Sequence, residues 1–258
     1  MKILAIMGSP RKKGNTYKIT KKLEEEMKAL GKVEFEYLFL QDVNLKPCKG
    51  CFMCISKGED RCPLKDDDRD EIVSKIMDAD GVILASPVYV MQVTWLMKIL
   101  VDRLAYLCHR PELFKQKTIA VSTTGGIGLK ETLNYIELVA GSWGMNVVDK
   151  LGIVTPPWHK TSSSDIKNNK NIRKTANIFY KSIESTELPK PSLMDYMRFR
   201  IVKEMSNRLD GYLQADYQFY SKLDNYYYDT KISIFKKLMG KIMLKIGFYT
   251  MRDNFVEK

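Results

Sequence analysis

Residues 2–16 read KILAIMGSPRKKGNT and contain the clearest structural signal in the chain. A short apolar run, Lys2–Met7, leads directly into a loop bounded by Gly8 and Gly14. Residues 17–30 then carry apolar side chains at helical spacing. Strand, glycine-bounded loop and helix in this order form an anion site in α/β proteins, because the loop N–H groups and the helix N-terminus point at one spot.

The chemistry of this loop suits the terminal phosphate of a small molecule. Ser9 and Thr16 supply hydroxyl donors, Asn15 an amide and Arg11 a charged fork for phosphate oxygens. No acidic residue precedes Glu24, so nothing close in sequence repels a dianion. The loop lacks the lysine of nucleoside-triphosphate loops and the G-x-G-x-x-G of dinucleotide loops. An ordinary strand–turn–helix joint, which would need the same glycines, is the alternative.

The rest of the chain alternates strand and helix patterns. Further strands are predicted over residues 33–40, 81–86, 118–123 and 145–154. Helices are predicted after an N-cap in Asp66-Asp67-Asp68, over residues 93–107 and 130–139, and up to residue 184. This order predicts the α/β class: a flavodoxin-like, five-stranded parallel sheet of order 2-1-3-4-5 with helices on both faces. Its ligand crevice would be formed by the loops after strands 1, 3 and 4.

Three stretches carry a resemblance to a known family. The loop from Gly8 to Thr16 resembles the FMN phosphate loop of the NADPH-dependent FMN reductase family, which has a flavodoxin-like fold. Ser86-Pro-Val-Tyr89 and Thr123-Thr-Gly-Gly126 resemble its second and third flavin loops, and the match covers roughly the first 155 residues. The resemblance implies that FMN is the cofactor and NAD(P)H a co-substrate.

The resemblance also implies which residues hold FMN. The phosphate would lie against Ser9, Arg11, Gly14, Asn15 and Thr16, and the ring against Pro87, Val88, Tyr89, Thr124, Gly125 and Gly126. We expect the N–H groups of Val88 and Tyr89 to donate to the ring edge, and Tyr89 to stack on the ring. Ordinary turn chemistry would also explain Pro87 and the glycines.

Four cysteines form a separate motif. Cys48, Cys51, Cys54 and Cys62 have the spacing C-x2-C-x2-C-x7-C, followed by Pro63. The spacing is similar to that of ferredoxin-type [4Fe–4S] sites, and it resembles the compact motif of iron–sulfur flavoproteins, a branch of the same family. We predict these four as ligands of one [4Fe–4S] cluster. Zinc, or four reduced thiols without metal, are the alternatives. Cys108 lies apart and is expected to be buried.

Charge and composition narrow the function. The formal net charge is +11, but the lysines are scattered among acids and no nucleic-acid-binding motif is visible, so we expect no nucleic-acid partner. No signal peptide or transmembrane segment is visible, which favours the cytoplasm. No catalytic residue is predicted, because His109 and His159 belong to no triad and flavin hydride chemistry needs no protein nucleophile.

The C-terminal part exceeds what a flavodoxin-like domain needs. We predict a domain over residues 1–187 and a helical, aromatic and basic extension over residues 188–258. In the extension a helix is expected over residues 194–213. Apolar residues at 232, 235, 239, 242 and 246 then form an amphipathic stripe, with lysines on another face.

Three interpretations of the extension are open. The stripe packs on the domain or on a second subunit, it lies on an anionic membrane, or the tyrosines cover the flavin crevice of a partner subunit. We favour the first and expect a homo-oligomer, a dimer or tetramer.

Together these patterns predict an FMN-dependent oxidoreductase. It would take electrons from NAD(P)H or another low-potential donor and pass them to a small-molecule or protein acceptor, with a [4Fe–4S] cluster as an additional centre. The alternative is a non-catalytic FMN electron carrier or redox-sensing protein.

Overall fold

A five-stranded parallel sheet forms the centre of the fold, in a computed structural model that describes residues 1–156, 158 and 162–250. The strand order is β2-β1-β3-β4-β5, as the sequence predicts. The strands are β1 (Lys2–Met7), β2 (Glu34–Phe39), β3 (Gly81–Pro87), β4 (Lys117–Thr124) and β5 (Asn146–Val154). The chain adds β2 on one side of β1 and then adds β3, β4 and β5 on the other side. The switch point of the sheet therefore lies between β1 and β3.

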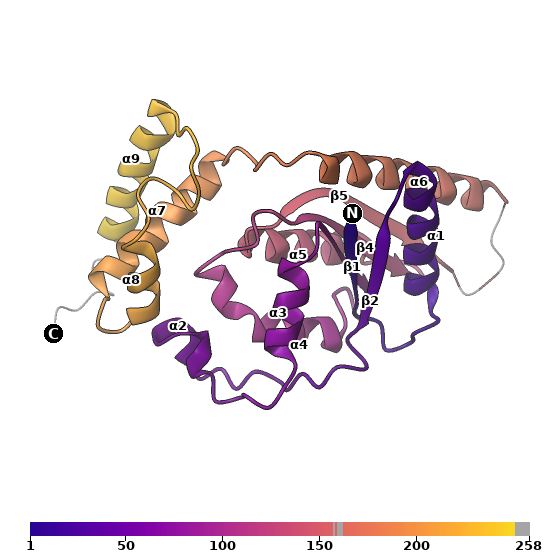
Figure 1. The fold of residues 1–258 in the computed structure, drawn as a ribbon, viewed down its shortest axis with the longest axis horizontal. Coiled ribbons are helices and arrows are strands. Elements are labelled where there is room, and N and C mark those ends of the chain that lie inside the picture. The colour runs from indigo at the N-terminus through magenta and orange to yellow at the C-terminus, as the bar shows by residue number, and fades with distance from the viewer. Residues whose placement is uncertain (157, 159–161, 251–258) are drawn as a thin grey trace. The chain divides into compact units, whose positions relative to one another are not determined.

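Helices cover both faces of the sheet (Figure 1). On one face lie α1 (Asn15–Leu30) and α6 (Ser162–Glu184); on the other lie α3 (Arg69–Met77), α4 (Trp95–Arg103) and α5 (Leu129–Ser142). The prediction of a single helix over residues 93–107 is wrong in detail. Helix α4 begins at Trp95, after the N-cap Thr94, and a separate 3-10 turn, η2 (Ala105–Cys108), follows it.

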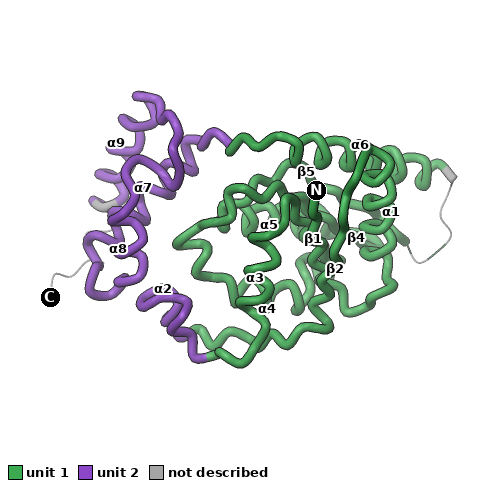
Figure 2. Tube along the Cα trace, in the orientation of Figure 1, with its two compact units in different colours: residues 1–50, 64–188 green, residues 51–63, 189–258 purple. Residues whose placement is uncertain are grey.

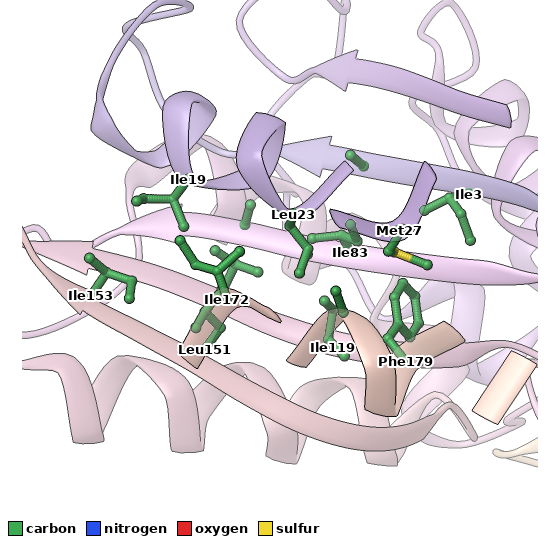
Figure 3. Packing of buried hydrophobic residues seen from close by; sticks show 14 of the residues in the cluster. Ile3, Ile19, Leu23, Met27, Ile83, Ile119, Leu151, Ile153, Ile172 and Phe179 are labelled. Atoms are coloured by element: carbon green, nitrogen blue, oxygen red, sulfur yellow. The ribbon is translucent and has the colours of Figure 1, made fainter. Parts of the chain in front are cut away.

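Burial on both faces explains the unbroken apolar runs of the central strands. In β1, Ile3, Ala5 and Met7 belong to a core cluster with α1 and α6 (Figure 3). Leu4 and Ile6, which point to the opposite face, are equally buried. A strand covered on both sides has no solvated face, so alternation of apolar and polar residues disappears.

The chain divides into two compact units, shown in Figure 2. The first contains residues 1–50 and 64–188, which include the whole sheet. The second contains residues 51–63 and 189–258. Its elements are α2 (Met53–Ser56), η1 (Glu59–Arg61), α7 (Leu193–Arg208), α8 (Gln214–Tyr220) and α9 (Ile234–Thr250). Nothing in the sequence indicates that residues 51–63 group with the C-terminal helices.

The tyrosine-rich segment forms the core of the second unit. Tyr196, Phe199, Tyr220, Tyr226 and Ile232 are buried together in one cluster. Tyr196, Tyr220 and Tyr226 are therefore used in this core, whereas Tyr217 is 40% exposed. The helix expected over residues 194–213 also ends earlier, at Arg208, and a second helix begins at Gln214. The oligomeric state stays a prediction. Within the described ranges, no helix has both the length and the apolar character needed to cross a membrane.

A buried carboxylate joins α1 to β2. Glu24 accepts hydrogen bonds from Lys21 at 2.7 Å, Lys28 at 2.6 Å and the Tyr37 hydroxyl at 2.7 Å. Burial acts to raise the pKa of Glu24, but these three donors outweigh it and hold the pKa below its ordinary value. Burial, and then the Glu24 carboxylate, raise the pKa of Tyr37. The charged carboxylate therefore stabilises the folded state.

We expect Glu24→Gln to lower the free energy of unfolding at neutral pH by ~1.5–3 kcal/mol, the usual contribution of hydrogen bonds to a charged group. The folded-state pKa of Glu24 lies below the ordinary value of 4.5. The wild-type advantage is thus fully present above that value and disappears as the pH falls through the folded-state pKa. Denaturant unfolding across this pH range, with the exposed Glu25→Gln as control, measures the difference. An advantage that stays constant in acid would contradict the assignment.

Candidate functional site

The site lies where the ends of β1 and β3 approach each other. The Gly8 N–H donates to Ala85 O at 2.7 Å, and the Thr94 hydroxyl donates to Gly8 O. The Thr94 N–H in turn donates to the Ser86 hydroxyl at 3.1 Å. These bonds connect the loop after β1 to the loop after β3 at the switch point, where ligands of open parallel sheets bind.

A cavity of about 270 Å³ opens at this point. Its walls come from the loops after β1, β3, β4 and β5. The lining residues are Ser9, Arg11, Asn15, Thr16, Pro87, Val88, Tyr89, Thr123, Thr124, Gly125 and Thr155. Nine of the eleven predicted flavin-site residues are among them; Gly14 and Gly126 are not. Thr123 and Thr155 also line the cavity, although neither was among the predicted flavin-site residues. The only signal for Thr155 was its position directly after the last strand, and His159 of the same loop lies outside the described residues.

The end of the cavity near α1 has the features of an anion site. The first helical hydrogen bond of α1 runs from Lys18 N to Gly14 O at 3.1 Å, so the N–H groups of Asn15, Thr16 and Tyr17 precede the helical ladder. The first turn contains no acidic residue. The preceding loop is held in shape by the Ser9 hydroxyl, which accepts from Arg11 N at 3.1 Å. A phosphate fits here, because several donors and the positive end of the helix dipole converge.

The cations of this loop differ in their pairing. Lys12 forms an ion pair with Asp42 at 2.6 Å. Arg11 lines the cavity and has no carboxylate partner within the described part of the chain. Arg11 is therefore the side chain whose charge is available to an anion in the cavity, whereas the charge of Lys12 is already neutralised.

The opposite end of the cavity corrects one expectation. The Val88 N–H donates to Thr123 O at 2.8 Å, and the Tyr89 N–H donates to Gln92 O at 2.8 Å. Both N–H groups are thus engaged within the chain, and the expectation that they donate to a flavin edge is wrong for this conformation. Pro87 and Val88 instead contribute an apolar wall to the cavity.

The Tyr89–Gln92 pair closes a two-residue turn next to the cavity. Gln92 N also donates to Tyr89 O at 3.0 Å, and the two central residues, Val90 and Met91, have φ of 46° and 66°. Positive φ is costly for a β-branched residue. Val90 gains no burial in return, since it is 98% exposed. The strained turn presents an apolar side chain to solvent beside the cavity, as functional loops do.

Hydrogen bonds between Asn44 and Asp68, the last residue of the triplet Asp66-Asp67-Asp68, join the two ends of the segment that carries the cysteines. Asn44 N donates to the Asp68 carboxylate at 2.7 Å, and Asp68 N donates to Asn44 O at 3.0 Å. Asp67 accepts from Arg103 of α4 at 2.8 Å, and this ion pair is buried, with 1% and 2% of the two side chains exposed. Asp68 does stand at the N-cap position of α3, but the expected side-chain cap is absent because its carboxylate is used by Asn44.

The four motif cysteines are distributed over both units. Cys48 belongs to the first unit, and Cys51, Cys54 and Cys62 belong to the second. Cys62 is buried, whereas Cys48 and Cys51 are exposed. Four thiols match a [4Fe–4S] cluster in number and kind. In the described ranges, no three His, Cys, Asp or Glu side chains are gathered as metal ligands. Cys108 is exposed and contacts the Ser142 hydroxyl at 3.1 Å, so the expectation that it is buried is wrong.

Sheet order, switch-point cavity and phosphate-type loop together define a flavodoxin-like protein with a ligand site between β1 and β3. The model of the family described as NADPH-dependent FMN reductase matches residues 1–160. The chain belongs to this family. Membership places it among the flavin-dependent oxidoreductases.

Individual relatives agree with this assignment. An iron-sulfur flavoprotein of Archaeoglobus fulgidus is 32% identical over 228 residues, which are 86% of this chain and 98% of that protein. An iron-sulfur flavoprotein of Methanosarcina thermophila is 37% identical over 151 residues, 57% of this chain and 77% of that protein. Among solved structures, RosB with a bound 8-demethyl-8-formylriboflavin-5′-phosphate intermediate has a TM-score of 0.56 at 13% identity, covering 91% of this chain and 92% of that one. This last likeness concerns the fold alone.

We expect Asp67→Asn to lower the free energy of unfolding by ~3–5 kcal/mol, because it removes the charge of Asp67 from a buried ion pair with the Arg103 guanidinium. Asp102→Asn, on the same helix as Arg103, is the matched control. Asp102 pairs with Lys98, and the two side chains are 44% and 51% exposed, so its loss should cost less than ~1 kcal/mol. Denaturant unfolding followed by circular dichroism measures both. Equal effects of the two substitutions would refute a structural role for the buried pair.

Proposed function

We propose that the chain is an FMN-dependent oxidoreductase that takes electrons from NAD(P)H or another low-potential donor and passes them to a small-molecule or protein acceptor. The observation that carries the proposal is the switch-point cavity, which three separately predicted loops line together. Family membership supports FMN as the cofactor.

In this proposal some residues of the cavity bind the phosphate of FMN and others contact its ring. Ser9, Arg11, Asn15 and Thr16 hold the phosphate, with the N–H groups at the start of α1. The Thr16 hydroxyl is fixed by the Thr123 hydroxyl at 2.8 Å, which joins the phosphate loop to β4. FMN, when bound, supplies hydride and single-electron transfer.

The other cavity residues orient the ring. Pro87 and Val88 form an apolar wall and exclude water from one end of the cavity. The Thr124 hydroxyl donates to Ile127 O at 2.7 Å and accepts from Gly126 N at 3.2 Å. These two bonds shape the loop after β4, so that Thr124 and Gly125 lie at the cavity while Gly126 supports the turn behind them. Gly14 has a similar supporting role in the first loop, since its N–H donates to Arg11 O at 3.0 Å.

We further propose that Cys48, Cys51, Cys54 and Cys62 bind one [4Fe–4S] cluster. The motif spacing supports the cluster, and so does the name iron-sulfur flavoprotein that the two relatives carry. Lys46, Lys49 and Lys57 in the same segment would offset the negative charge of four thiolates.

We expect Arg11→Ala to weaken FMN binding ten- to a hundredfold, since a charge-assisted hydrogen bond contributes about 1.5–3 kcal/mol. Lys12→Ala removes a neighbouring charge that is already paired with Asp42, so it should change the affinity by less than about threefold. Titration of the apoprotein, followed by quenching of FMN fluorescence, measures both dissociation constants. If Arg11→Glu binds FMN as tightly as wild type, the phosphate lies elsewhere.

Anaerobic reconstitution tests the cluster. The wild-type chain should take up iron and sulfide in equal amounts, because a [4Fe–4S] cluster contains them in equal number. Cys51→Ala should take up much less, and Cys108→Ala, outside the motif, should match wild type. Iron and sulfide analysis, with an absorption spectrum, gives the readout. Uptake of zinc alone, or equal iron in wild type and Cys51→Ala, would exclude the four cysteines as cluster ligands.

The second candidate function is a non-catalytic electron carrier. The exposed, strained turn at Val90 and Met91 favours it, because an apolar tip beside the cavity suits docking of a protein partner. Steady-state assays separate the two functions. Rapid NAD(P)H oxidation with a quinone or azo dye supports the enzyme. Turnover that is absent with small acceptors, but restored by a redox protein, supports the carrier.

A further inference from the structure

Helix α9 exposes a row of large apolar side chains. Phe235, Leu238 and Ile242 are 64%, 55% and 42% exposed. They follow one another at intervals of three and four residues, so they lie on one face of the helix. Such contiguous exposed apolar surface is uncommon on soluble proteins and usually marks an interaction site.

The opposite face of α9 already packs within its own unit. Gly240 and Leu244 are buried, and α9 contacts α7. A Cβ added at Gly240 would lie only 3.0 Å from the ring of Tyr196, so the two helices approach closely there. The orientation of α9 is thus fixed by α7, and the exposed row plays no part in the aromatic core of the unit.

Lysines border the apolar row. Lys237, Lys241 and Lys245 recur every four residues and are all exposed. Leu238 lies three positions before Lys241, which makes the two rows neighbours on the helix surface. The sequence from Thr230 to Arg252 contains five lysines and no acidic residue. An apolar face beside a cationic face is the pattern of helices that lie in the surface of an anionic bilayer.

A cavity between α7 and α9 adds a place for an anionic group. It measures about 230 Å³ and is lined by Arg200, Glu204, Arg208, Lys241, Leu244 and Lys245. Four cations thus surround one carboxylate, and that carboxylate pairs with Arg208 at 3.0 Å. The remaining positive charge suits a phosphate, and the apolar row on the same helix suits the acyl chains attached to it.

We propose that α9 binds the surface of a bilayer containing anionic phospholipids, with Phe235, Leu238 and Ile242 inserted among the acyl chains and Lys241 and Lys245 at the headgroup phosphates. A bilayer explains both rows. A second protein copy would explain the apolar row, but lysine is depleted in protein interfaces. A nucleic acid would explain the lysines, but protein–nucleic acid interfaces are polar and leave the apolar row without a role.

Co-sedimentation of the full chain with vesicles tests the proposal. The chain should bind vesicles of phosphatidylcholine mixed with phosphatidylglycerol, and binding to phosphatidylcholine alone should be at least about tenfold weaker. Raising the salt concentration should weaken binding to the anionic vesicles. Lys241→Glu with Lys245→Glu should abolish it. Lys170→Glu with Lys181→Glu, on exposed positions of α6, makes the same charge change and should leave it intact.

The apolar row is tested separately by Leu238→Gln with Ile242→Gln, which should weaken vesicle binding at least about tenfold. Circular dichroism and FMN titration should match wild type for every variant, since none of these residues lines the flavin cavity. Failure to bind anionic vesicles, or binding that survives both α9 double substitutions, overturns the proposal. Self-association that light scattering detects without vesicles, and that the glutamine variant abolishes, would assign the row to a second copy. Retention of RNA without retention of vesicles would assign the lysines to nucleic acid.

Discussion

The close approach of two chain segments at Gly8 determines the geometry of the switch-point cavity. A Cβ added at this position would lie 3.0 Å from Met97 Cβ and 3.3 Å from Ala85 O, so a side chain here would push the ends of β1 and β3 apart. With glycine, the backbone bond from Gly8 N to Ala85 O and the bond from the Thr94 hydroxyl to Gly8 O can both form. They hold the start of α1 and the loop after β3 around one cavity, and the loop from Gly8 to Thr16 acquires its orientation from this contact.

Much of the fold could be predicted because its determinants are local. Each central strand is a short apolar run, and alternation with helices restricts the sheet to very few topologies. Three of the loops at the carboxyl edge of the sheet can therefore be assigned to one crevice from the sequence alone. Thr155 could not be predicted as a lining residue, because a threonine after a strand forms no distinctive sequence pattern. The hydrogen bond from Tyr89 N–H to Gln92 O could not be predicted, because it depends on the turn at Val90 and Met91. Valine and methionine rarely adopt positive φ.

Long-range pairing explains the other differences between expectation and structure. Three consecutive aspartates before a helix suggest a cap, yet Asp67 is drawn to Arg103, thirty-six positions away, and Asp68 to Asn44. In the extension, the sequence does not indicate which tyrosines are buried, and Tyr196, Tyr220 and Tyr226 pack around Phe199. Periodicity describes which face of a helix is apolar, but it does not indicate what that face meets. The same limit explains why α9 could be recognised as amphipathic while its free face and its packed face could be separated only by the structure.

The cysteine segment folds with helices that are synthesised much later. Phe52 stacks on Tyr212, with ring centroids 6.5 Å apart, and α2 contacts α8, so residues 51–63 complete a unit whose other part begins at residue 189. On the ribosome, at roughly 5–20 residues per second, the intervening stretch delays this partner by on the order of ten seconds. During that interval the thiols emerge before the helices that shelter part of their segment. Of these sulfur atoms, that of Cys62 is buried once the segment is packed, so synthesis is the stage at which oxidants and metal ions have the freest access to it.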